Sequence, residues 1–122
     1  METANRAING IKTYEAYSFT AANDATINDN YKIIRIGDIA IANIYVSKLP
    51  TVTTDGWITV ATMPIMSRAN ISFDADIISG LGTSPIIRDG LVTLNNINVY
   101  ITATDSGKRF RAVVPFIILQ NG

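Results

Sequence analysis

The fold is indicated most clearly by residues 39–48, which read Ile39-Ala40-Ile41-Ala42-Asn43-Ile44-Tyr45-Val46-Ser47-Lys48. Successive side chains of a β-strand point to opposite faces, so the four even-numbered residues from Ala40 to Val46 share one face. That face is wholly apolar, whereas the opposite face carries Asn43 and Tyr45 beside two Ile residues. This period of two predicts a half-buried antiparallel strand.

The same alternation recurs in other windows, for example at Ile97, Val99 and Ile101. Gly, Asn, Asp and Pro cluster at intervals of about ten residues, which is the turn spacing of an all-β sandwich. One such turn is predicted at Asp89-Gly90. The predicted strands cover residues 12–20, 31–37, 39–48, 57–63, 67–74, 85–88, 91–94, 96–103 and 108–119. We therefore expect an all-β domain of eight or nine strands, with two antiparallel sheets packed face to face.

Composition supports strands and excludes several kinds of chemistry. The 122 residues include 20 Ile and 13 Thr but only 5 Leu and 2 Glu, and β-branched side chains suit pleated sheets. The chain has no Cys and no His, which excludes disulfides, thiol nucleophiles, a His general base and Cys/His zinc sites. We expect no catalytic residue, no resident metal and no cofactor.

Charge and hydropathy narrow the range of partners. Ten basic residues balance ten acidic ones, so neither nucleic acid nor an anionic membrane is the expected partner. The longest apolar run is residues 112–119, which is far too short to span a bilayer. The first five residues lack the basic and apolar regions of a signal peptide.

The predicted strand over residues 108–119 is apolar on both faces. Phe110, Ala112, Val114 and Phe116 lie on one face, and the other face contains Val113, Pro115, Ile117 and Leu119. A sandwich strand needs only one buried face, so the second face predicts a homo-oligomer with Val113, Ile117 and Leu119 at its interface. The alternative is burial of that face within the monomer, for instance beneath an N-terminal arm.

Aromatic and acidic residues are the candidates for ligand binding. Trp57 and Tyr100 could stack on a sugar ring, while Asp74 and Asp76, which share one face of a strand, could bind hydroxyl groups. Three alternatives remain open. Trp57 could pack in the core or at an interface, and the two carboxylates could hold a divalent cation or act as the acids of a glycosidase.

The order of four segments resembles the C-terminal domains of bacteriophage tail-fibre, baseplate and receptor-binding proteins. The segments are Arg35-Ile36-Gly37-Asp38-Ile39-Ala40, Gly56-Trp57-Ile58-Thr59-Val60-Ala61-Thr62-Met63-Pro64, Arg88-Asp89-Gly90-Leu91-Val92-Thr93-Leu94 and Asn98-Val99-Tyr100-Ile101-Thr102. The resemblance covers residues 31–119. It implies a jelly-roll-like sandwich, assembled as a trimer and displayed on a virion, in which the Gly-Trp segment is structural.

The resemblance also implies partners. They are further copies of the chain, other virion proteins and host-surface polysaccharide. Residues 31–122 would form the sandwich domain, and residues 1–30 would form an anchoring arm with the first strand. A capsid decoration or head-fibre protein is the alternative function, followed by a small carbohydrate-active enzyme or a bacterial adhesin domain.

Overall fold

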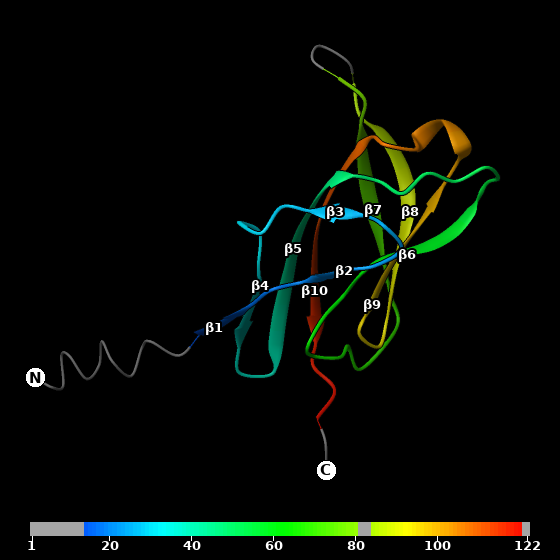
Figure 1. Cartoon of the computed structure of the whole chain (residues 1–122). Helices are drawn as coiled ribbons and strands as arrows, with labels where there is room; N and C mark the ends of the chain where they lie inside the picture. Colours follow the sequence, from blue (N-terminus) through cyan, green and yellow to red (C-terminus); the bar gives the residue numbers. More distant parts are fainter. Residues whose placement is uncertain (1–13, 81–83, 121–122) are drawn as a thin grey trace, which may run out of the picture.

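The computed structural model describes residues 14–80 and 84–120, which form one antiparallel sheet of ten strands (Figure 1). The described part contains a single helical element, the 3-10 turn η1 (Ala103–Asp105), and no helix long and apolar enough to cross a membrane. The strands are β1 (Tyr14–Tyr17), β2 (Thr20–Ala21), β3 (Thr26–Ile27), β4 (Ile33–Ile36), β5 (Ile39–Lys48), β6 (Gly56–Thr62), β7 (Ile71–Ile78), β8 (Ile86–Thr93), β9 (Asn96–Ile101) and β10 (Arg109–Ile117).

The sheet is curled, and the segment from β2 to β3 bridges its two ends. Strand order is β1-β4-β5-β10-β7-β8-β9-β6-β2, and β3 pairs with β5 beside β4. Because β2 pairs with β6 and leads directly into β3, residues 20–27 cross from the last strand of the path back to the third (Figure 1). The predicted all-β antiparallel class is confirmed. The strands that were expected to form two separate sheets belong here to one hydrogen-bonded sheet.

Inward-facing side chains of the curled sheet form one apolar core. All four even-numbered apolar residues of β5, from Ala40 to Val46, are fully buried, as the alternation predicts. They meet the fully buried side chains of Phe110 and Val114 on β10 and of Ile97 and Val99 on β9. Each large apolar side chain buried in this way contributes about 1.5–3 kcal/mol to folding.

Strand β10 lies at the centre of the sheet and is paired unequally on its two edges. It pairs with β5 from Phe110 to Ile117 but with β7 only from Arg109 to Arg111. Beyond Arg111 the two strands separate. On the β7 side, the Arg68 N–H donates to the Ile117 carbonyl. Because backbone groups of alternate strand residues point to the same edge, the other odd-numbered residues of β10 also direct theirs to the β7 side. Pro115, which has no N–H, lies on this unpaired stretch, where no ladder donor is required.

The turn predicted at Asp89-Gly90 is wrong, because both residues lie inside the continuous strand β8. Gly90 is buried, and a Cβ atom built there would overlap the ring of Phe73 on β7. That ring is itself stacked on Phe110, with centroids 6.4 Å apart. Glycine is present because another side chain occupies the space above it, and not because the chain turns.

Two further boundaries differ from the prediction. The strand expected at residues 67–74 begins and ends about four residues later, as β7, and the short strands β2 and β3 were not expected. Residues 14–30, which were assigned to an arm, contribute β1, β2 and β3 to the same sheet as the rest of the chain. Residues 1–13 of that arm lie outside the described part.

Replacing Gly90 with alanine is expected to lower the free energy of unfolding by about 1–3 kcal/mol, the usual cost of overpacking a core. The added methyl group would displace the Phe73 ring from Phe110. Urea unfolding of Gly90→Ala measures the effect, with Gly56→Ala as the control, because nothing lies within 4 Å of a Cβ at Gly56. Equal stability of the two variants would contradict this account of Gly90.

Candidate ligand-binding site

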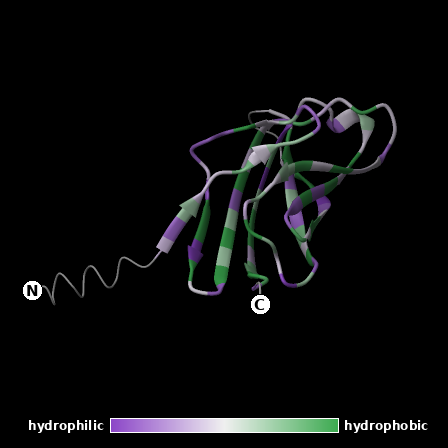
Figure 2. Cartoon of the chain, turned by 60° about the horizontal axis from the view of Figure 1, so that its bottom comes forward, coloured by the Kyte–Doolittle hydropathy of each residue, from purple (hydrophilic) through white to green (hydrophobic). Residues whose placement is uncertain are grey.

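The outward side of the curled sheet is divided into two surfaces of different character. Strands β1, β4, β5 and β10 present what we call the apolar outer face. Figure 2 shows the hydropathy of each residue along the ribbon. The register places Ile39 between Ile36 and Ile117, so these side chains are direct cross-strand neighbours. The exposed members of this face are Tyr14, Ile36, Ile39, Ile41, Val113 and Ile117.

The second surface, called here the polar outer face, lies on β6, β9, β8 and β7. Trp57 on β6 pairs in register with Tyr100 on β9, and Asp89 on β8 pairs with Asp74 on β7. Gly90 on β8 pairs with Val99 on β9, so in this antiparallel register the next pair is Asp89 with Tyr100. The four residues therefore form one row across four adjacent strands, all on the outward side.

The row borders a shallow hollow with a volume of about 400 Å³. Trp57 is 52% exposed, and its ring meets that of Tyr100 at 5.7 Å between centroids and at 80° between planes. An exposed indole offers a flat apolar surface, while carboxylates and hydroxyls accept or donate hydrogen bonds. The hollow is lined by Trp57, Ser72, Phe73, Asp74, Asp89, Gly90 and Leu91.

A second hollow of about 370 Å³ lies where β7 and β10 separate. Asp74 lines both hollows, so they adjoin. Next to it, the rings of Tyr31 and Tyr45 lie 5.2 Å apart, and the Arg111 guanidinium lies 5.8 Å from the centre of the Tyr45 ring. The second hollow is lined by Tyr31, Asn43, Asp74, Asp76, Arg111, Ala112 and Val113.

The structure brings the sequence-predicted binding residues together on one surface. Trp57, Tyr100 and Asp74 lie in the same row, and Asp76 lies two residues further along the outward side of β7. Packing of Trp57 in the core is wrong, because half of its surface is exposed. The prediction that Asp74 and Asp76 share a face is confirmed. Their role in binding stays a prediction.

Several lining residues were missed from the sequence. Asp89 was assigned to a turn, and reading β8 as one strand would have placed it opposite Asp74. Arg111 lines the second hollow beside Tyr45, its direct partner on β5, but that placement depends on strand register, which is not encoded locally. Among the described residues, no group of three acidic side chains is placed to hold a metal ion.

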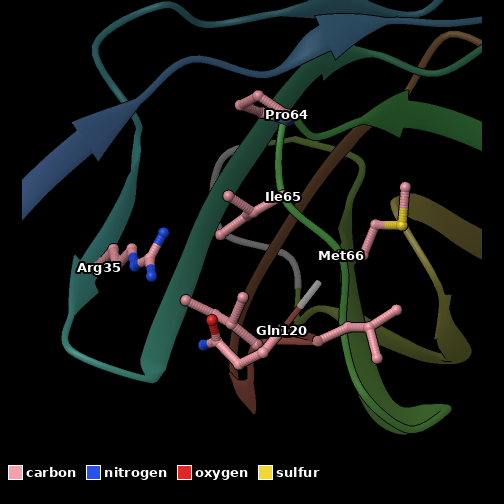
Figure 3. A pocket seen from close by; sticks show the side chains of 7 residues that line it. Arg35, Pro64, Ile65, Met66 and Gln120 are labelled. Carbon is pink, nitrogen blue, oxygen red and sulfur yellow. The ribbon is translucent and has the colours of Figure 1, made fainter. Parts of the chain in front are cut away.

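The predicted interface residues do not all lie together. Val113 and Ile117 project from β10 on the apolar outer face. Leu119 follows the strand, and its N–H donates to the Met66 carbonyl. It lines a third hollow, in which the side chains of Arg35 and Gln120 lie opposite Ile65 and Met66 (Figure 3).

A buried ion pair holds β8 to the end of β9 on the inward side of the sheet. The fully buried carboxylate of Asp105 accepts from Arg88 Nε at 2.9 Å and Nη2 at 3.2 Å, and from the Thr102 N–H at 2.9 Å. Burial alone would raise the pKa of Asp105, but the Arg88 and Thr102 hydrogen bonds and the guanidinium charge outweigh it and hold that pKa below its ordinary value. This pair fixes Arg88, the residue next to Asp89 of the row.

Comparison of the chain with protein-family models, with curated proteins and with solved structures found no match in any of the three. The family resemblance of the sequence therefore stays a proposal.

Replacing Asp105 with asparagine is expected to lower the free energy of unfolding by about 3 kcal/mol at pH 7. This is the lower end of the range for breaking a buried ion pair, because the Arg88 side chain is 26% exposed. The folded pKa of Asp105 lies below the unfolded value of about 3.9, so its contribution is present above that value and is lost as pH falls through the folded pKa. Unfolding of both proteins between pH 7 and pH 2 measures this.

The exposed Asp29→Asn variant is the control and should retain the stability of the unmutated protein. A gap between the Asp105→Asn variant and the unmutated protein that stayed constant down to pH 2 would contradict the ionised state of Asp105.

Proposed function

We propose that this chain is a non-enzymatic adhesion module of a bacteriophage virion, of the tail-fibre or baseplate type. In this proposal it assembles as a homotrimer through the part of the apolar outer face around Ile36, Ile39 and Ile117, which leaves the second hollow beside Val113 open, and it binds host-surface saccharide through the polar outer face. Its curled sheet would be a variant of the jelly-roll sandwich of that class. The observation that carries the proposal is the separation of apolar and aromatic-acidic side chains into two outward surfaces of one sheet.

Self-association is supported by the size and continuity of the apolar outer face. Ile36, Ile39 and Ile117 pair in register to form one outward row across β4, β5 and β10, and Ile41 lies in the next row. Ile36 is 56% exposed and Ile39 is 54% exposed. Monomeric proteins rarely leave such contiguous apolar surface in water, and a symmetric oligomer would remove it. The zero net charge of the chain places no electrostatic penalty on contact between identical copies.

Saccharide binding is supported by the aromatic and acidic groups that border the first hollow. Trp57 presents an exposed ring, and Asp74 and Asp89 lie beside it as hydrogen-bond acceptors. Hydroxyl groups of a sugar would donate to these carboxylates while the apolar face of the ring covers the indole. In a trimer three such shallow sites would act together, so each site can be weak and the assembly still adhere.

Replacing Ile117 with aspartate is expected to dissociate the oligomer, because the interface would bury a charge without a partner. Light scattering should give three times the 13.2 kDa chain mass for the unmutated protein and one chain mass for Ile117→Asp. Leu94→Asp replaces an apolar residue outside the face that is somewhat more exposed than Ile117, and it should leave the trimer intact. A monomeric unmutated protein would contradict the assembly.

Replacing Trp57 with alanine is expected to weaken saccharide binding at least tenfold, which corresponds to about 1.4 kcal/mol. A glycan array identifies the bound saccharide, and calorimetry on that saccharide compares the variants. Met66→Ala, which truncates an exposed apolar residue elsewhere, is the control and should bind normally. Unchanged affinity of Trp57→Ala would rule out the first hollow as the site.

Assays on the purified protein also distinguish the alternative functions. Tight binding to capsid shells without any glycan binding would favour a decoration or head-fibre protein over an adhesin. Release of new reducing ends from a bound polysaccharide would favour a carbohydrate-active enzyme, with the Asp74 and Asp76 carboxylates as its acids.

A further inference from the structure

We infer that the two adjoining hollows form one binding groove, and that the groove selects an uncharged oligosaccharide bearing an N-acetylamino group. This inference rests on the proposed saccharide-binding function and specifies its ligand. In it, one sugar ring covers Trp57 in the first hollow. The acetamido group of another ring enters the second hollow beside Arg111.

The continuity of the two hollows requires a ligand longer than one ring. Asp74 lines both, and the lining residues at the two ends, Trp57 and Asn43, come from β6 and β5, which are five strand positions apart. Strands are spaced by about 4.8 Å, so the groove spans roughly 24 Å along the sheet before curvature is considered. A single sugar ring covers only part of that length, so an oligosaccharide is the occupant that uses both ends.

The second hollow offers the three kinds of contact that an acetamido group needs. Arg111 supplies N–H donors for the acetyl carbonyl, and Asp74 or Asp76 supplies an acceptor for the amide N–H. The Tyr31 ring provides apolar surface for the methyl group. Beyond Arg111, β7 no longer pairs with β10, so no paired strand closes the floor of the hollow and the acetamido group can enter it.

The charge of the groove disfavours acidic sugars. Asp74, Asp76 and Asp89 place three carboxylates along it, against the single guanidinium of Arg111. Asp74 and Asp89 face each other directly across β7 and β8, an arrangement of like charges that destabilises a sheet. A uronic acid or a sialic acid would add a further negative charge there. The hydroxyls of a neutral sugar would instead donate hydrogen bonds to the three carboxylates.

Calorimetry with the unmutated protein tests the ligand class. The probes are glucose oligomers, N-acetylglucosamine oligomers and glucuronic acid oligomers, each from one to six rings. We expect affinity for the N-acetylated series to rise at least tenfold from one ring to four rings. At four rings it should exceed the glucose series and the glucuronic acid series by at least tenfold. Equal affinity for the glucuronic acid series, or no gain with length, would overturn the inference.

Variants separate this inference from the function on which it rests. Arg111→Leu should abolish the preference for N-acetylated over unsubstituted oligomers, whereas Arg68→Leu, an exposed control elsewhere, should retain it. Asp76→Asn should raise affinity for the glucuronic acid series at least threefold, because one repelling charge is removed. If Trp57→Ala abolishes binding but Arg111→Leu keeps the preference, saccharide binding stands and the groove is wrong. If no oligosaccharide of any series binds, both fail.

Discussion

The pairing of β10 with β5 on one edge and with β7 on the other is the constraint on which the rest of the structure depends. The β5 ladder is long and places Phe110, Val114 and their even-numbered neighbours in the core. The β7 ladder ends after three residues. Because the ladder between β10 and β7 is limited to these three residues, the two halves of the sheet can face each other across one core. The same short ladder opens the hollow between β7 and β10.

This arrangement has an energetic cost on the outward side of the sheet. A curled sheet hides one face of each strand, so the alternate residues of β4, β5 and β10 must point to water. Around Ile36, Ile39 and Ile117 these residues are large, apolar and about half exposed in the described part of the chain. On the other half, Asp74 and Asp89 bring like charges together. Neither surface is favourable for an isolated chain, and each becomes favourable when a suitable partner contacts it.

The sequence predicted best the strands whose alternation is local. Strand β5 has the predicted bounds and the predicted buried face, since its pattern is unbroken over ten residues. The prediction divided strand β8 because Gly90 was interpreted as a turn residue. Glycine is needed there because the ring of Phe73, seventeen residues away in sequence, occupies the space that a Cβ atom would take. Strands β2 and β3 have two residues each, too few for any period to be detected.

The candidate site shows the same limit. The sequence identifies Trp57, Asp74 and Asp76 as candidates by residue type and spacing. That Trp57 and Asp74 lie on one surface, however, depends on the register of four strands. Asp105 could not be recognised as a buried ion-pair partner, because its neighbours Ser106 and Gly107 are typical of an exposed turn. Its partner Arg88 lies on another strand, and only the folded chain brings them together.

The central claim is that the exposed indole of Trp57 is a ligand contact. Because Trp57 is the only Trp in the chain, its fluorescence reports on this hollow without any mutation. Titration of the unmutated protein with a neutral N-acetylated tetrasaccharide is therefore the most direct test. The account predicts a saturable shift of the emission to shorter wavelength and protection of Trp57 from acrylamide quenching. Unchanged emission and unchanged quenching at millimolar saccharide would contradict it.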